Sequence, residues 1–212
     1  MSAAPSPRPR VRARRGEGDR LRAEILAATE QLLIRTGDQE AVSIRAIADA
    51  VGVTPPSIYL HFADKNELLA AVCEMRFAEL DRCMSEAAAA VDDPLEALWA
   101  RGQAYVQFGL GNPEHYRILF MTRPLAGATA AAAEAGRLPG LAAFGHLVDD
   151  VATAMDAGAI AAGDPFLVAT GLWTVVHGIT SLLIARPDFP WPDLAELMAH
   201  VVSVSARGLA PS

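Results

Sequence analysis

Three prolines in this chain each follow directly after an aspartate or an asparagine. The pairs are Asp93-Pro94, Asn112-Pro113 and Asp164-Pro165. A short polar side chain accepts hydrogen bonds from the free N–H groups at a helix start, and proline fits the first helical position because its missing N–H had no partner there. Each pair therefore predicts the start of a helix. Strands are not expected, because alternating β-branched runs are absent and Ala, Leu and Glu dominate.

Capping residues predict the starts of three further helices, because a short polar side chain satisfies free N–H groups in the first turn. These caps are Asp19, Ser43 and the Asp64–Glu67 pair, ahead of helices over 20–36, 44–50 and 65–90. Apolar residues at helical spacing predict two more helices, over 138–157 and 192–207. With the three helices above and a short one after Gly52, the chain is expected to be all-α, with about nine helices.

The segment 165–185 carries no formally charged residue over its 21 positions. That length is enough to span a membrane. Against a membrane span stand His177, three threonines, a serine and two glycines, and flanking residues without a positive bias. A helix that is apolar all round is also typical of burial between protein neighbours. We therefore expect a helix buried within the protein, with a membrane span as the alternative.

Residues 44–62 carry the pattern of two short helices joined by a tight turn. Gly52 falls where a helix end needs a left-handed backbone, and Thr54 is placed to cap the second helix. Pro55 and Pro56 then occupy the first turn, where a missing N–H costs nothing. The pattern predicts a helix-turn-helix. A plain helical hairpin with its aromatic residues packed internally is the alternative.

The second helix of this pair has two distinct sides, because successive side chains are about 100° apart. Ile58 and Phe62 share one side and are expected in the core. The far side and its flank carry Pro56, Ser57, Leu60 and Tyr59. Such a surface suits a DNA major groove, where apolar groups touch thymine methyls and hydroxyls reach bases or phosphates. Lys65, in the first turn of the next helix, is placed for a phosphate.

The formal net charge of −7 conceals a basic N-terminal part and an acidic remainder. Residues 1–65 carry nine Arg and one Lys against eight acids, a net charge of +2, whereas residues 66–212 carry eight Arg against seventeen acids, a net charge of −9. A basic N-terminal part before an acidic remainder suggests that residues 1–65 bind a polyanion. The alternative is a basic tail that only increases solubility. Residues 1–18 are rich in Pro, Arg and Gly and lack the apolar centre of a secretory signal, which predicts a disordered basic arm.

The stretch "VSIRAIADAVGVTPPSIYLHFADKNELLAAV" over 42–72 resembles the DNA-binding segment of the TetR family of bacterial transcriptional regulators. The likeness rests on Ala48, Gly52, Tyr59, His61, Phe62, Lys65, Leu68 and Leu69, and with the preceding helix it covers about 19–72. The resemblance implies a DNA-binding surface made of Ser43, Arg45, Thr54, Pro55, Pro56, Ser57, Tyr59, Leu60, His61 and Lys65. His61 and Lys65 would hold phosphates. The family often has a charged or hydrogen-bonding residue where Pro55 and Leu60 stand, so fewer direct hydrogen bonds to bases are expected.

The stretch "LWTVVHGITSLL" over 172–183, with 112–120 and 157–165, resembles the C-terminal domain of a TetR subgroup with a Trp-x-x-x-His-Gly signature. Such domains usually form a ligand pocket and a homodimer through the last two helices. The resemblance implies the ligand-binding candidates Trp99, Phe108, Phe120, Phe144, Trp173 and His177. The alternative for each aromatic residue is ordinary core packing, and for His177 a hydrogen-bonded core position.

Catalytic patterns are missing from the sequence. The five histidines lack the HExxH spacing, no Ser-His-Asp arrangement is visible, and "GLGNPEH" has no preceding strand that would make it a dinucleotide loop. Cys73 and Cys83 match neither a zinc pattern nor a disulfide framework, and are expected to be core residues in a reducing cytosol. Neither a cofactor nor a metal nor an enzymatic activity is expected.

These features predict a disordered basic arm over 1–18, a helix-turn-helix DNA-binding domain over 19–65, and a helical effector-binding and dimerisation domain over 66–212. The resemblance implies a cytoplasmic, ligand-responsive transcriptional regulator without a membrane attachment. Its simplest form is a homodimeric repressor that a small molecule releases from a palindromic double-stranded DNA operator. The alternative is an all-α small-molecule-binding protein or enzyme without DNA binding.

Overall fold

The computed structural model describes residues 17–121 and 138–209, which contain nine helices and no strand. In chain order the helices are α1 (Glu17–Thr36), α2 (Ile44–Val51), α3 (Pro55–Ile58), α4 (Lys65–Ala89), α5 (Pro94–Gly111), α6 (Pro113–Phe120), α8 (Leu141–Asp156), α9 (Pro165–Ala185) and α10 (Leu194–Leu209). The expected all-α fold is confirmed. An Ala-rich link over 126–136 and residues 1–16 of the expected arm lie outside the described residues.

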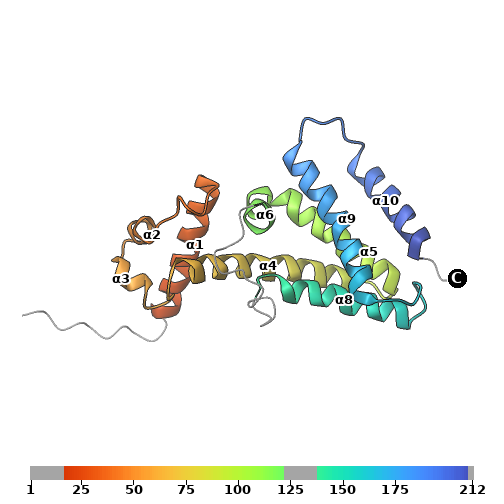
Figure 1. The fold of residues 1–212 in the computed structure, drawn as a ribbon, viewed down its shortest axis with the longest axis horizontal. Coiled ribbons are helices and arrows are strands. Elements are labelled where there is room, and N and C mark those ends of the chain that lie inside the picture. Colours follow the sequence, from red (N-terminus) through yellow and green to blue (C-terminus); the bar gives the residue numbers. More distant parts are fainter. Residues whose placement is uncertain (1–16, 122–137, 210–212) are drawn as a thin grey trace, which may run out of the picture.

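The long helix α4 is the axis of the molecule. α1, α2 and α3 gather around its N-terminal end, and we call them the head (Figure 1). α5 and α8 pack along α4 farther on, and α9 packs on α5 and α8. We call α5, α8, α9 and α10 the body. α6 lies between the two parts and contacts α1, α4 and α5.

Most helix starts lie where the sequence predicts them, because a cap depends on residues within one turn. The confirmed caps, whose side chains accept hydrogen bonds from first-turn N–H groups, are Ser43, Asp64, Asp93 and Asp164. Two expected caps are wrong. Asp19 lies inside α1, which begins at Glu17. Asn112 donates its amide N–H to the carbonyl oxygen of Phe108 at the end of α5 and makes no side-chain cap for α6.

The core of the head extends into helices beyond it. Ile25, Ile47 and Ile58, from α1, α2 and α3, are fully buried in one cluster. Val72 of α4 and Ile118 of α6 pack into the same cluster. A division of the chain between residues 65 and 66 therefore falls in the first turn of a continuous helix, and that division remains a prediction.

Two walls of the body, α5 and α9, approach closely at the buried Gly109. A Cβ atom at this position would collide with the methyl group of Thr180 on α9 and would lie 2.9 Å from the ring of Tyr116 on α6. Glycine is required here because any side chain would push these helices apart.

α9 coincides with the uncharged segment 165–185. By length and composition it could cross a membrane, and it is the one helix in the described part of the chain that passes this test. Ala169, Thr180 and Ile184 of this helix are buried, and it packs against α5 and α8 as one layer of the body.

An ion pair at the junction of head and body joins α1 to α4. The Glu30 carboxylate is only 6% exposed and accepts a hydrogen bond from Arg76 Nη2 at 2.8 Å. Arg76 also pairs with Glu79 on its own helix. His115 Nε2 of α6 lies 3.5 Å from the Glu30 carboxylate. Polar groups of three helices thus meet at one buried point.

Arg76→Ala should destabilise the fold by about 3–5 kcal/mol, because it leaves the buried Glu30 carboxylate without its charged partner. The matched control is Arg82→Ala on the same helix. Arg82 pairs with Glu86 where the two side chains are 60% and 64% exposed, so its loss should cost far less. Urea unfolding followed by circular dichroism measures both free energies. Equal losses would contradict the dependence of Glu30 on Arg76.

Candidate functional site

The short helices α2 and α3 form a fixed pair in the head. Ser43 Oγ accepts a hydrogen bond from Ala46 N at 3.1 Å and starts α2. Gly52 ends α2 with a φ of 75°, and Val53 N then donates to the carbonyl oxygen of Ala48 at 2.9 Å. The expected helix-turn-helix is confirmed.

The side of α3 that faces away from the core is largely apolar. Leu60 is 77% exposed and Tyr59 is 53% exposed. Pro55 and Pro56, at the first two positions of α3, are also exposed. Ile58 is fully buried on the opposite side. These four exposed residues form the surface of α3 and of the turn after it, and α3 lies at the end of the molecule far from α10 (Figure 1).

Polar groups beside this surface already have partners within the head. Thr54 Oγ1 and Ser57 Oγ lie 3.1 Å apart in a mutual hydrogen bond. The expectation that the Thr54 side chain caps α3 is therefore wrong. Lys65 Nζ donates to the carbonyl oxygen of Gln39 at 3.0 Å and lies 3.7 Å from the Glu40 carboxylate. Lys65 thus ties the connection between α1 and α2 to α4, and its contact with a phosphate remains a prediction.

Basic side chains flank the surface. Arg45 is exposed in the first turn of α2, and His61 is half-buried after α3. The guanidinium carbon of Arg22, on α1, lies 5.0 Å from the centre of the Phe62 ring, a cation–π contact. Arg22 was not predicted at this surface, because its position depends on how α1 folds against the turn after α3.

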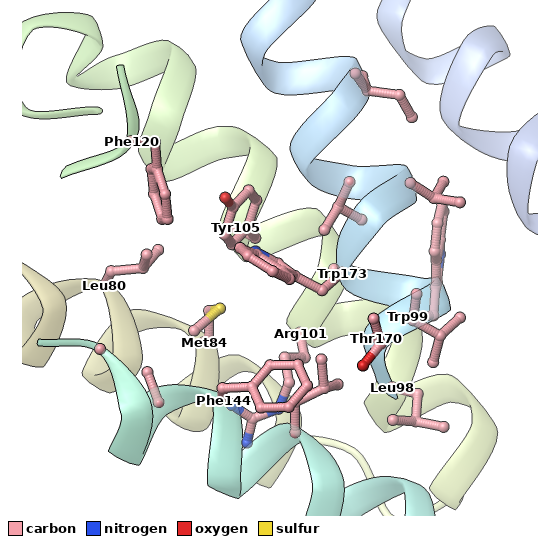
Figure 2. A pocket seen from close by; sticks show the side chains of 18 of the residues that line it. Leu80, Met84, Leu98, Trp99, Arg101, Tyr105, Phe120, Phe144, Thr170 and Trp173 are labelled. Atoms are coloured by element: carbon pink, nitrogen blue, oxygen red, sulfur yellow. The ribbon is translucent and has the colours of Figure 1, made fainter. Parts of the chain in front are cut away.

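The body contains a cavity of about 990 Å³ that reaches from α4 to α10 (Figure 2). Its size is at the upper end of ordinary ligand pockets, about 300–1,000 Å³, and most of its lining side chains are apolar. Four of the six predicted ligand-binding residues line it: Trp99, Phe120, Phe144 and Trp173. Phe108 and His177 are not among the lining residues. Phe108 is 7% exposed and packs in the core of the body.

The helix α9 separates two parts of this cavity. Figure 2 shows Trp173 with Tyr105 and Phe144 on one side of α9, and Trp99 on the other side, toward α10. We call the first part the chamber, lined by Leu80, Met84, Tyr105, Phe120, Phe144 and Trp173. We call the second part the α9–α10 groove, lined by Trp99, Met198, Val201 and Val202.

Next to the chamber, the side chains of Tyr105, Tyr116 and His177 form a hydrogen-bonded cluster. The hydroxyls of Tyr105 and Tyr116 lie 3.0 and 2.8 Å from His177 Nδ1, and 3.2 Å from each other. Burial lowers the pKa of His177 and raises the pKa of both tyrosines, that of Tyr116 to about 12. The imidazole is therefore neutral and the hydroxyls keep their protons. The cluster joins α5, α6 and α9 without a charge.

A buried arginine forms part of the chamber floor. Arg101 is 6% exposed, and its Nε donates to Asp150 Oδ2 at 2.6 Å. Its Nη1 lies 3.9 Å from the Asp81 carboxylate, which His146 Nδ1 approaches to 2.9 Å. The sequence analysis predicted neither Arg101 nor Tyr105. The one signal for them is their separation of four positions, which puts them on the same face of α5.

Two profiles of known families match this chain. Residues 25–72 match "bacterial regulatory proteins, tetR family", and residues 98–204 match "tetracyclin repressor-like, C-terminal domain". The second match alone covers half of the 212 residues. The chain belongs to the TetR family. This assignment agrees with the expectation of a regulatory protein rather than an enzyme.

Three known proteins that resemble this chain are less than 30% identical to it. The HTH-type transcriptional activator FasR of Mycolicibacterium smegmatis is 29% identical over 102 residues, which cover 48% of this chain and only 46% of FasR. A solved protein of unknown function from Rhodococcus sp. RHA1 is 28% identical with a TM-score of 0.74, over 90% of this chain and 95% of that one. FadR of Bacillus subtilis, solved with stearoyl-CoA, has a TM-score of 0.70 at 16% identity, over 88% and 98% of the two chains. At that identity FadR shows the fold alone.

The half-buried His177 of this TetR-family body predicts a pH dependence of stability. Its pKa in the folded protein lies below the ordinary 6.5, so the unfolded chain takes up the proton first as the pH falls. The contribution of His177 to the free energy of unfolding is therefore full above pH 6.5 and is lost as the pH falls through the lower pKa. Chemical unfolding at about pH 8 and about pH 5.5 should show a larger loss for the native chain than for His177→Gln. An identical loss in both proteins would mean that His177 is not held neutral.

Proposed function

We propose that this TetR-family chain is a ligand-responsive, DNA-binding transcriptional regulator, in its simplest form a homodimeric repressor that a small molecule releases from DNA. The observation that supports this function is the position of α6. Ile118 packs in the core of the head, and Phe120, two residues later, lines the chamber. A ligand that displaces Phe120 therefore acts on the same helix that supports the head.

Release from DNA follows if the ligand and the DNA prefer different arrangements of the heads. Two symmetric heads must fit half-sites about one helical turn, ~34–36 Å, apart. A ligand lowers DNA affinity only when it binds the DNA-incompetent arrangement more tightly. The ten residues predicted for the DNA surface, from Ser43 to Lys65, are proposed as the contact set.

The cavity favours an effector with a long apolar part. The residues that line the cavity as a whole extend along α5 from Leu95 to Tyr105, a distance of about 15 Å at 1.5 Å per residue. FadR, which has the same fold, is solved with stearoyl-CoA. We assign to this chamber a long acyl chain or a molecule of similar shape. The predicted contacts with Phe120, Phe144 and Trp173 belong to this proposal, whereas Trp99 lies in the α9–α10 groove.

The outer side of α9 supports a second copy of the chain as the dimer partner. One stripe on this side, at helical spacing and without a charged residue, consists of Leu167, Gly171, Thr174, Gly178 and Leu182. Leu167 is 69% exposed and Leu182 is 51% exposed. Among residues 17–121 and 138–209, no atom outside the helix lies within 4 Å of where a Cβ of Gly171 or Gly178 would stand, so a partner helix has room to approach closely.

Leu182→Glu should convert the dimer into monomers, because a charge would be buried without a partner at the interface. Tight operator binding should be lost with it, since both heads are needed for two half-sites. The matched control is Ala78→Glu, which adds a carboxylate at an exposed position of α4. Sedimentation velocity reads the assembly state. A stable monomer in the native chain would contradict the dimer proposal.

The function itself is tested by selecting sites from a random DNA pool with the native chain, then titrating stearoyl-CoA against the selected site. Stearoyl-CoA should release the DNA. Ala143→Leu, on the cavity lining, should weaken stearoyl-CoA binding about tenfold through overpacking and leave DNA affinity unchanged. Ala142→Leu, exposed and next to it on α8, is the control. Failure to enrich any site would reject DNA binding, whereas a bound site indifferent to stearoyl-CoA would reject only the ligand class.

A further inference from the structure

The exposed residues of α3 and of the turn after it are mostly apolar and carry few hydrogen-bond donors. Leu60, in the turn after α3, is 77% exposed, and Pro56, in the first turn of α3, is exposed too. Pro55, next to it, is exposed as well. Neither proline has an N–H group to donate. Three exposed residues close together in the chain thus carry apolar side chains, and the helix α3 lies at the outer end of the head (Figure 1).

Donors near this surface are few. The hydrogen bond between the Thr54 and Ser57 hydroxyls, 3.1 Å apart, uses one of their two protons. The ammonium group of Lys65 already donates to a backbone carbonyl. Within the described residues around α3, the Tyr59 hydroxyl, the Arg45 guanidinium and the His61 imidazole have no hydrogen-bond or charged partner; Tyr59 and Arg45 are exposed, and His61 is half-buried.

The major groove of DNA displays one apolar group on the base edges, the 5-methyl group of thymine. We propose that this head reads pyrimidine 5-methyl groups through Pro55, Pro56 and Leu60, and that hydrogen bonds to base edges come from Arg45. The inference rests on the DNA-binding function proposed above and adds the chemical feature of DNA that α3 selects.

Recognition of a base through its 5-methyl group can be told apart from recognition through its hydrogen-bonding edge by changing one of the two at a time. Uracil keeps the hydrogen-bonding edge of thymine and lacks only the methyl group, whereas 5-methylcytosine keeps the methyl group and changes the edge. Loss of one contacted methyl group should weaken binding about fourfold, the factor that corresponds to one buried methylene-sized group. A surface that reads methyl groups should therefore discriminate thymine from uracil and accept 5-methylcytosine.

The experiment uses the native chain and a site selected from a random DNA pool. Each thymine is replaced singly by uracil, and each T·A pair by 5-methylcytosine·G and by cytosine·G, and affinities are read by fluorescence anisotropy. At the contacted positions uracil should bind about fourfold more weakly than thymine. At the same positions 5-methylcytosine should bind more tightly than cytosine.

Two variants locate the effect on the protein. Leu60→Ala should abolish the difference between thymine and uracil at one or more positions, whereas Leu60→Met, an apolar residue of similar volume, should retain it. Equal binding of thymine and uracil at every position overturns the proposal. So does a uracil loss that is the same in the native chain and in Leu60→Ala. A chain that enriches no site overturns the DNA-binding function as well, so the two failures are distinguishable.

Discussion

The structure depends on one helix that is buried in two different cores. Near its start, Val72 of α4 is fully buried among the side chains of the head. Farther along, Leu80 and Met84 are buried in the body and line the cavity. A helix keeps its backbone hydrogen bonds internal and so moves as a unit. The direction in which the head points therefore follows from how the second half of α4 packs in the body.

Two neighbouring residues in the first half of α6 tie this helix to α1 and to α9 through polar contacts. His115 approaches the buried Glu30 carboxylate at the junction with the head. Tyr116 reaches across to His177 and holds α6 to α9. Buried polar groups are costly when a partner is lost, so intermediate positions of α6 are disfavoured relative to fully bonded ones. If a ligand moves α6, a change between discrete arrangements is therefore favoured over gradual displacement.

The features that could be predicted from the sequence are helix caps and turns, which depend only on neighbouring residues. Asp164 caps α9 and Gly52 closes the turn after α2, because both depend only on residues within one turn. The side of a helix on which a ring lies depends on packing between distant segments. Trp99 and Trp173 are both large and apolar, yet they lie on opposite sides of α9. His177 meets hydroxyl groups that are 61 and 72 positions away in the chain, and no local pattern could predict that contact.

The missing side chain at Gly109 has a consequence for the chamber, although this residue does not line it. Gly109 sets how closely α5 approaches α9, and these two helices carry Tyr105 and Trp173 on facing walls. A larger residue would act as a wedge between the walls and admit thicker molecules. The width of the chamber between α5 and α9 thus depends on a residue that does not line the chamber. Changes in the range of accepted molecules among such proteins can therefore arise at helix crossings as readily as in the lining.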